Sequence, residues 1–203
     1  MDIYTIGHTN HSIEEFIKLL KSHKINCIVD VRSTPLSKYT PQFNKDAIKK
    51  MLKINGIYYI HMGKEFGARR ENRSLYTSDG YLDFEKTRKD DEFLKGINRI
   101  KNGCNNGFVI SLMCTEKDAF DCHRGIMVSK GLKDNGFNIK HILPDNTIET
   151  QEKLEERLVN KYFSQISFDS YLNGQMTQQE MIEEGYRKRN KEIGYRIEGD
   201  DID

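Results

Sequence analysis

The sequence predicts an α/β fold: a mostly parallel five-stranded sheet with helices on both faces, plus a C-terminal helical extension. Three observations predict it. Short apolar runs alternate along the chain with segments of helical period. The run at residues 27–31 is apolar almost throughout, which is typical of a strand buried on both faces. The length of 203 residues suits one core domain, which we place at residues 1–163, with the extension at residues 164–203.

The first elements are defined by where apolar runs stop. Residues 3–6 form a short apolar run that a glycine ends, as expected of a strand. Ser12 then begins a helix, because Glu15 follows at the spacing of a capping box. The second strand is the run at residues 27–31. Two prolines in residues 33–44 predict a loop there.

The middle of the chain repeats this alternation once and then departs from it. A second helix at residues 45–53 ends at an Asn-Gly pair, and the strand at residues 57–61 follows. Residues 63–90 are polar with little periodicity, and loops of that length in compact domains are usually functional or mobile. A third helix at residues 91–101 leads to the strongest strand, at residues 108–113.

The last part of the core contains two more helices and one strand. A helix that begins near Asp121 is expected to end before the Asn-Gly pair at 135–136. The strand at residues 138–143 is closed by a proline, and a charged helix then spans residues 147–163. Residues 164–203 are rich in glutamine, then basic, then acidic, which predicts a helical or partner-facing extension.

Composition and charge narrow the classes of partner. The chain has 32 basic and 31 acidic residues, so its net charge of +1 provides no argument for nucleic acid or an anionic membrane. Its four cysteines include no C-x-x-C pair, which favours free thiols in a reducing cytoplasm. No apolar stretch approaches a membrane span, and the N-terminus has no signal-peptide pattern. We therefore expect a soluble cytoplasmic protein without a membrane partner, and make no prediction of its oligomeric state.

Polar side chains follow the predicted strands at the points where the strands end. The carboxyl ends of parallel strands meet at one edge of a sheet, and open α/β sheets bind their ligands there. Five strand ends carry ionisable or hydrogen-bonding side chains, which include those of His8, Thr9, Asn10, Asp30, Arg32, Ser33, His61, Lys64, Glu65, Cys114, Glu116, Asp145 and Asn146. Each is a weak signal alone, and their convergence on one edge predicts a site.

Cys122, His123 and Arg124 are the sharpest local signal. If Asp121 caps the predicted helix, the three fill its first turn, where unpaired backbone N–H groups favour anions. A thiol in that place, beside an arginine and a histidine, has a lowered pKa and is a candidate nucleophile. The alternative is a buried structural cysteine, with Arg124 paired to a carboxylate such as that of Glu116.

Three further groups have a functional and a structural interpretation each. Asp30 and Arg32 share one face of a buried strand, where they either form an ion pair or leave Arg32 to bind an anionic substrate group. Arg69 and Arg70 either complete a phosphate or carboxylate pocket or belong to a solvated loop. His8 either acts as a general acid or base or bonds to a neighbouring loop.

Spacing excludes several familiar sites. Cysteine phosphatases need C-x5-R, but the sixth residue after Cys114 is Phe120 and the sixth after Cys122 is Val128. A zinc site from Cys114, Cys122 and His123 lacks the usual ligand pairing, since adjacent residues rarely bind one ion. The chain has neither a Walker loop nor a G-x-G-x-x-G motif. We therefore expect no metal and no cofactor.

Several spaced motifs, in the same order, resemble domain-of-unknown-function family 488. They are Tyr4-Thr5-Ile6-Gly7-His8-Thr9-Asn10, Val29-Asp30-Val31-Arg32-Ser33-Thr34-Pro35, Pro41-Gln42-Phe43-Asn44, Cys114-Thr115-Glu116 and Cys122-His123-Arg124. The resemblance runs from Tyr4 to about Leu143, and the segment 186–190 is similar to the tail of longer members. Thr9 stands where serine is usual, and Ala68 where a second glycine is common. The resemblance implies an α/β domain with these motifs as its site, and it supplies no reaction.

The favoured hypothesis is an enzyme that acts on a phosphate-bearing anion, a nucleotide or a nucleic acid. Cys122 would be the nucleophile or acid–base thiol, with Cys114 and Glu116 beside it and His8 as the general acid or base. The residues assigned to substrate binding are Asn10, Asp30, Arg32, Ser33, Arg69, Arg70, His123 and Arg124. Two alternatives stay open: a non-catalytic module that binds a nucleotide or nucleic acid, and ion pairs that only brace the sheet edge.

Overall fold

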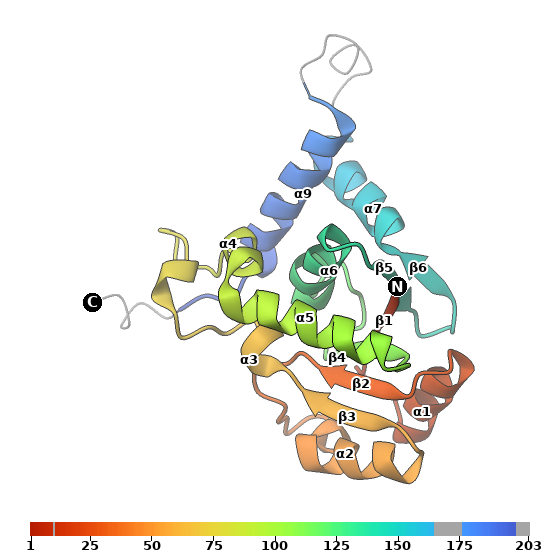
Figure 1. Cartoon of the computed structure of the whole chain (residues 1–203). Coiled ribbons are helices and arrows are strands. Elements are labelled where there is room, and N and C mark those ends of the chain that lie inside the picture. The colour runs from red at the N-terminus through yellow and green to blue at the C-terminus, as the bar shows by residue number, and fades with distance from the viewer. Residues whose placement is uncertain (10, 165–175, 198–203) are drawn as a thin grey trace.

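The computed structural model describes residues 1–9, 11–164 and 176–197, and its architecture is the predicted α/β one (Figure 1). Six strands form one sheet in the order β3-β2-β4-β1-β5-β6. The first five strands are parallel, and β6 pairs antiparallel with β5. The strands are β1 (Asp2–Gly7), β2 (Cys27–Asp30), β3 (Tyr58–His61), β4 (Ile110–Cys114), β5 (Asn138–Ile142) and β6 (Ile148–Thr150). The mostly parallel sheet is therefore confirmed.

The sixth strand is the difference from the predicted five. We expected a helix to begin at Thr147, but the chain makes a tight turn after β5. In it the N–H of Leu143 donates to the carbonyl of Thr147 at 2.9 Å, and Asn146 adopts a left-handed φ of 70°. This turn lays residues 148–150 against β5 as β6. The helix begins after it, with Thr150 as the cap whose side chain accepts a first-turn N–H.

Helices cover both faces of the sheet. They are α1 (Ile13–Ser22), α2 (Lys45–Ile54), α3 (Gly63–Phe66), α4 (Phe84–Lys89), α5 (Asp91–Asn105), α6 (Lys130–Asp134), α7 (Gln151–Phe163) and α9 (Gln178–Ile193). Single turns of 3-10 helix are η1 (Pro41–Phe43) and η2 (Arg73–Leu75), and the π-helix η3 (Arg124–Ser129) runs directly into α6. Within the described ranges, no helix combines the length and hydropathy that crossing a bilayer requires.

The sheet separates two layers of helices (Figure 1), and an apolar core lies on each of its faces. One core joins α1 and α2 to one face of the sheet and includes Phe16, Ile28 and Ile48. The other joins α5, α6, α7 and α9 to the opposite face and includes Val29 and Phe93. Ile28 and Val29 are neighbours in β2 and point to opposite faces, and both are at most 1% exposed. This two-sided burial explains why the strand reads as almost continuously apolar.

Two sequence signals for helix ends, the capping box of α1 and the Asn-Gly pair after α2, are confirmed. Ser12 and Glu15 form the predicted capping box: the Ser12 N–H donates to Glu15 Oε2 at 2.9 Å, and the Glu15 N–H donates to Ser12 Oγ at 3.2 Å. The predicted end of α2 is found at Asn55 and Gly56, where Gly56 has a φ of 72°. A side chain at that φ would be strained, so the Asn-Gly signal has a physical cause.

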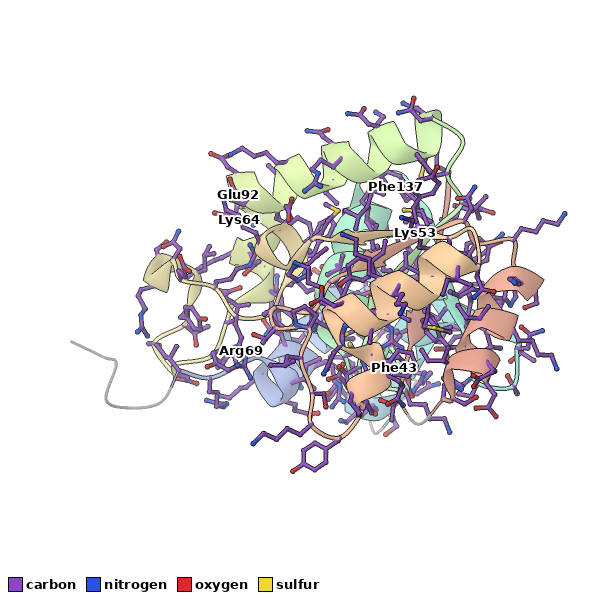
Figure 2. All side chains as sticks on the ribbon, turned by 90° about the horizontal axis from the view of Figure 1, so that it is seen from below. Phe43, Lys53, Lys64, Arg69, Glu92 and Phe137 are labelled. Carbon is purple, nitrogen blue, oxygen red and sulfur yellow. The ribbon has the colours of Figure 1, made fainter. Side chains whose placement is uncertain are left out.

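The polar stretch at residues 63–90 contains α3, η2 and α4, where we expected a long loop. Each of these helices is at most six residues long, so none completes the two turns that would show a helical period. Asp83 caps α4 by accepting the N–H of Lys86 at 3.0 Å. An ion pair of 3.1 Å between Lys64 and Glu92 links α3 to α5, and Figure 2 shows the two side chains together.

The helix after β4 starts later than predicted. We placed Cys122, His123 and Arg124 in its first turn, but the helix begins at Arg124 as η3. Cys122 lies in the bend just before it, and its carbonyl accepts the N–H groups of Gly125 and Ile126 at 3.0 and 3.1 Å. A side chain at Gly125 would overlap the backbone of the preceding loop, so this tight turn depends on glycine. Cys122 therefore sits at the helix start rather than inside it.

The predicted C-terminal extension is helical where the structure describes it. Helix α9 contacts α7, α4 and η3, and it buries Met181, Tyr186 and Arg189. Arg189 donates from Nε to the carbonyl of Phe120 at 2.9 Å and also pairs with Asp121, the two residues just before Cys122. The parts of the extension at residues 165–175 and 198–203 lie outside the described residues. Helix α9 thus packs on the core and supports the turn that leads to Cys122.

Candidate functional site

The connections around β4 leave the sheet in opposite directions. The chain leaves β1 and β2 toward α1 and α2 on one face, and it leaves β4, which lies between them, toward η3 and α6 on the other. Such a switch point opens a crevice beyond the carboxyl ends of the strands, where α/β sheets hold their ligands. Cys114 is the last residue of β4 and therefore lies at this point.

Cys114, Glu116, Cys122 and His123 form one group of side chains at the switch point, which we call the thiol cluster. The Glu116 Oε2 atom lies 3.1 Å from the Cys114 Sγ and 2.9 Å from the Cys122 Sγ, so one carboxyl oxygen accepts from both thiols. The Cys114 Sγ lies 3.8 Å from His123 Nδ1. The thiols are 3% and 1% exposed, whereas Glu116 is an exposed residue. Although the residue as a whole is exposed, its carboxyl group lies against the two buried thiols.

The orientation of the His123 ring is fixed by the backbone. Its Nε2 lies 3.2 Å from the carbonyl oxygen of Val31, and because a carbonyl only accepts, Nε2 carries the proton of the neutral ring. In the neutral ring, the lone pair of Nδ1 then faces the thiol of Cys114. Burial opposes a charge on the ring, but the hydrogen bond with Cys122 and the charge of that thiol raise the pKa of His123. The strand-end residue Val31 thus sets which imidazole atom enters the thiol cluster.

The pKa values of the two thiols move in opposite directions. The hydrogen bond with Cys122 and then burial raise the pKa of Cys114 well above its usual value. Burial opposes ionisation of Cys122 too, but its hydrogen bond with Cys114 and the charges of Arg124 and His123 lower its pKa well below the usual value. Burial, followed by the neighbouring Cys122, raises the pKa of the Glu116 carboxyl. Cys122 is therefore the more readily ionised thiol of the pair.

Arg124 braces the loop that follows β4. Its side chain is 1% exposed, and it donates to the carbonyls of Glu116 and Lys117 at 2.5 and 3.0 Å and to Thr5 Oγ1 at 3.4 Å. The structural interpretation expected an ion pair with the Glu116 carboxylate, but that carboxyl group contacts the thiols instead. A Cβ at Gly7 would overlap the Glu116 carbonyl, so β1 also holds this loop.

Asp30 and Arg32 form the ion pair that the structural interpretation requires. Arg32 Nη2 lies 2.6 Å from Asp30 Oδ2, and Arg32 Nε lies 2.9 Å from Asp30 Oδ1. Tyr59 donates its hydroxyl to Asp30 at 2.7 Å, and Arg32 also donates to the carbonyl of Phe43 at 2.8 Å. Both charged side chains are buried, at 0% and 6% exposure. Protein atoms thus satisfy most of the Arg32 guanidinium.

The His8 side chain belongs to this ion-pair network, while its backbone N–H donates to the carbonyl of Cys114 at 3.0 Å. Its Nε2 lies 3.1 Å from Arg32 Nη1, and its ring stacks on Phe43 with centroids 4.4 Å apart. Because a guanidinium only donates, Nε2 accepts and Nδ1 carries the proton, for which no partner exists among the described residues. Burial and then the charge of Arg32 lower the pKa of His8 to about 4. The imidazole is therefore uncharged at neutral pH.

The predicted substrate-binding residues Ser33, Arg69 and Arg70 have their contacts elsewhere than in the thiol cluster. Ser33 Oγ accepts the backbone N–H of Arg69 at 2.9 Å, and the exposed Arg69 side chain stacks on Tyr195, beside the C-terminal segment in Figure 2. Arg70 donates its guanidinium to two backbone carbonyls of α3. Asn10 lies outside the described residues. The structure therefore divides the predicted candidates into the thiol cluster, the Asp30–Arg32 network and a separate arginine loop.

Sequence reasoning missed a cavity of about 570 Å³ beside this edge. The polar side chains that line it include those of Thr9, His11, Lys18, Ser22, Lys117 and Asn146. Thr9 and Asn146 follow predicted strands and are selected by the strand-end rule, and Lys117 follows the predicted residue Glu116, so the rule could have been extended to it. Lys18 lies on α1, and no strand-end signal points to it.

The family comparison bears directly on this edge of the sheet. A family model described as "Domain of unknown function DUF488" matches residues 12–130, more than half of the chain. The chain belongs to this family. The predicted resemblance is thereby confirmed, and the matched part of this DUF488 chain contains the whole thiol cluster and the Asp30–Arg32 pair. Helices α7 and α9 follow the matched part. Neither the curated proteins nor the solved structures provide a match to the chain.

Two buried histidines predict how stability depends on pH in this DUF488 protein. Burial and the neighbouring arginine, Arg32 for His8 and Arg124 for His141, lower both pKa values from 6.5 to about 4. The unfolded chain therefore binds protons first. Stability is complete above the unfolded pKa and is lost as the pH falls from about 6.5 toward 4. At pH 5 we expect a loss of roughly 2 kcal/mol per histidine.

Urea unfolding followed by circular dichroism at pH 7.5 and pH 5 measures this loss. The variant His141→Gln removes one titrating ring, whose nitrogens contact Thr5 and Gln151 at 2.8 Å each, so its pH-dependent loss should be about half that of the wild type. His11→Gln, at a partly exposed position, is the matched control and should keep the wild-type dependence. An unchanged dependence in His141→Gln would contradict the assignment.

Proposed function

We propose that this protein is an enzyme that acts on an anionic, phosphate-bearing substrate such as a nucleotide or nucleic acid, with Cys122 as its nucleophile. The observation that carries the proposal is one carboxyl oxygen of Glu116 within 3.1 Å of two buried thiols at the switch point of the sheet. A thiol, a base in hydrogen-bond reach and an oriented imidazole are the parts that nucleophilic catalysis needs. Fold alone would not support this step, because α/β sheets serve many chemistries.

Two contacts favour Cys122 over Cys114 as the attacking thiol. The N–H of Arg124 points at the Cys122 Sγ over 3.4 Å, and the helix that starts there turns its positive end toward the sulfur. Glu116 is placed to take the thiol proton as the carbon- or phosphorus-centred electrophile is attacked, and to return it to the leaving group, which departs with the electrons of the broken bond. Cys114 keeps its proton and donates to Glu116.

The cavity beside the edge supports the anionic class of substrate. Two lysines, Lys18 and Lys117, and two carboxylates, Glu15 and Asp145, line it. The carboxylates accept hydrogen bonds from Ser12 and Thr147, whereas neither lysine ammonium group has a hydrogen bond or salt bridge with a described residue. Arg32 and Arg124, which the sequence suggested as anion clamps, donate mostly to protein acceptors. We therefore assign the substrate anion to the lysines and give the two arginines the task of holding the strand ends.

Alkylation at pH 7 of protein first treated with a chelator tests the nucleophile. We expect iodoacetamide to modify Cys122 at least about tenfold faster than the same thiol in a short peptide, because thiolate is the reacting form. Cys104, a half-buried thiol on α5, is the internal control and should react at or below the peptide rate. Mass spectrometry assigns the modified residue. If Cys122 reacts no faster than the peptide thiol, it is not the nucleophile.

Comparison of iodoacetate with iodoacetamide tests the anionic substrate class on the same thiol. For each protein, the rate with anionic iodoacetate is divided by the rate with neutral iodoacetamide, and this ratio is compared with the same ratio for the thiol of a short peptide. The ratio of the wild type should be higher than that of the peptide, and it should fall in Lys117→Gln. Lys53→Gln, an exposed lysine on α2 shown in Figure 2, is the matched control and should leave the ratio unchanged. A ratio that both variants change equally would reflect net charge only, and would remove the support for an anion site at Lys117.

A non-catalytic binding module is the second candidate, favoured by the contrast between buried thiols and an open cavity. The thiols of Cys114 and Cys122 are 3% and 1% exposed, whereas the cavity of about 570 Å³ adjoins solvent-exposed lysines. This candidate predicts that Cys122→Ser binds an oligonucleotide as tightly as the wild type. Binding should weaken as salt rises, since lysine–phosphate contacts release counterions. A salt-independent affinity would exclude backbone contacts.

A further inference from the structure

We propose that the thiol cluster binds a thiophilic divalent cation, with Zn²⁺ as the best fit and Cys114, Cys122 and His123 as its ligands. Glu116 is placed as the fourth donor. The inference deepens the proposed function, on which its consequence for Cys122 rests: a coordinated cysteine is held as the thiolate and can remain a nucleophile. The site itself is argued from geometry and donor chemistry.

The ligand atoms lie close enough together for small side-chain movements to bring them around one ion. The Sγ of Cys114, the Sγ of Cys122 and a ring nitrogen of His123 all lie within 4.8 Å of one another. Around a tetrahedral zinc ion, with bonds of about 2.3 Å to sulfur and about 2.0 Å to nitrogen, the ligand atoms are about 3.5–3.8 Å apart. The 3.8 Å between the Cys114 Sγ and His123 Nδ1 meets this spacing without any movement.

Glu116 completes the donor set. Its Oε2 atom lies 3.1 and 2.9 Å from the two sulfurs, so it faces the same point from the solvent side. An ion between them would require the carboxyl group to move outward by only about 0.5 Å to reach ligand spacing. Two thiolates, one imidazole and one carboxylate are a donor set that suits zinc, because soft sulfur ligands select thiophilic ions over magnesium or calcium.

The surroundings of His123 match those of a metal ligand. Ligating histidines commonly donate their second ring N–H to a carbonyl or carboxylate, which fixes the tautomer and aims the free lone pair at the ion. Here Nε2 donates to the Val31 carbonyl at 3.2 Å, and Nδ1 faces the thiols. The backbone N–H of Arg124 lies 3.4 Å from the Cys122 Sγ, so a metal-bound thiolate would also have a hydrogen-bond donor.

The late helix start explains how adjacent residues can share one ion. We expected no zinc site because Cys122 and His123 are neighbours, and neighbours inside a helix point in directions about 100° apart. Cys122 lies in the bend before η3, outside the helix, so its side chain is free of that constraint. Both side chains therefore turn toward Cys114, across the loop that joins β4 to η3.

Metal titration of the full chain tests the site. After chelator treatment, Co²⁺ is added as a spectroscopic probe and then displaced with Zn²⁺. We expect one equivalent of Co²⁺ to produce thiolate-to-cobalt charge-transfer absorption together with the intense visible bands of a tetrahedral site. Cys114→Ser and Cys122→Ser should each remove the thiolate band or weaken binding at least a hundredfold. Cys104→Ser is the matched control and should bind as the wild type does.

A second measurement serves if a cysteine variant does not fold. One equivalent of Zn²⁺ should protect Cys114 and Cys122 of the wild type, but not Cys104, from a maleimide reagent, as read by mass spectrometry. Sub-stoichiometric binding, a cobalt spectrum without the thiolate band, or equal protection of Cys104 would overturn the site. A disulfide between Cys114 and Cys122 that persists in the presence of reductant and blocks metal uptake would overturn it as well.

The two proposals fail in different ways. If Zn²⁺ does not bind but Cys122 of the chelator-treated protein reacts rapidly, the nucleophile stands and the metal site falls. If Zn²⁺ binds with both thiols but metal-free Cys122 reacts like a peptide thiol, the metal site stands and the nucleophile falls. Glu116→Gln adds a graded result, because loss of a fourth ligand should weaken Zn²⁺ binding about tenfold while the thiolate band remains.

Discussion

Replacement of Asp30 by alanine is expected to lower the free energy of unfolding by about 3–5 kcal/mol, because it leaves a buried guanidinium without its counter-charge. Asp30 is 0% exposed and accepts three hydrogen bonds from Arg32, two from its side chain and one from its backbone N–H. It also accepts the hydroxyl of Tyr59. In the variant, Arg32 keeps only the Phe43 carbonyl and the His8 ring as partners. Urea unfolding at pH 7 measures the loss.

A double variant separates the unpaired charge from the lost packing. Asp30→Ala with Arg32→Met removes both charges, so it should be at least about 1 kcal/mol more stable than Asp30→Ala alone. Lys95→Ala is the matched control, since it breaks an exposed ion pair of 2.6 Å with Glu92 and should cost less than about 1 kcal/mol. If the double variant is no more stable than Asp30→Ala, the unpaired charge of Arg32 is not the cause of the stability lost in Asp30→Ala.

The fold could be predicted because its signals are local or are repeated at every strand. Parallel strands buried on both faces read as apolar runs, and a capping box such as that of Ser12 and Glu15 is visible in four residues. The missed elements lacked such signals. Strand β6 is three half-buried residues at the sheet edge, and its pairing depends on the turn around Asn146. Helices α3 and α4 are too short to show a period.

The site could be located from the sequence but not assembled. The strand-end rule places Cys114 and Glu116 at the correct edge, because topology alone brings those ends together. It cannot say which side chains touch. The structural interpretation paired the Glu116 carboxyl group with Arg124, yet the arginine donates to backbone carbonyls, which every residue has and no sequence pattern marks. The Val31 carbonyl that orients His123 is equally invisible in the sequence.

Replacement of Arg124 by glutamine is expected to cost about 3–5 kcal/mol and to disturb the thiol cluster as well. The Arg124 side chain is the largest of the fully buried ones, and its loss leaves the Glu116 and Lys117 carbonyls without their donors. Arg124→Lys keeps the charge, but a single ammonium cannot reproduce a planar fork that spans two carbonyls. We therefore expect it to lose about 2 kcal/mol or more in urea unfolding at pH 7.

The lysine variant decides between bracing and anion binding. If Arg124 braces the loop, Arg124→Lys loses stability and the reactivity of Cys122 falls with it, because the Glu116 backbone is released next to the thiols. If Arg124 instead clamps a substrate anion, the lysine variant keeps its stability and its thiol reactivity, and only the preference for iodoacetate changes. Arg157→Lys is the matched control: that guanidinium pairs with Asp118 and Glu149 but is 38% exposed, so the change should cost less than about 1 kcal/mol. The contacts of Arg124 with three protein acceptors favour the first outcome.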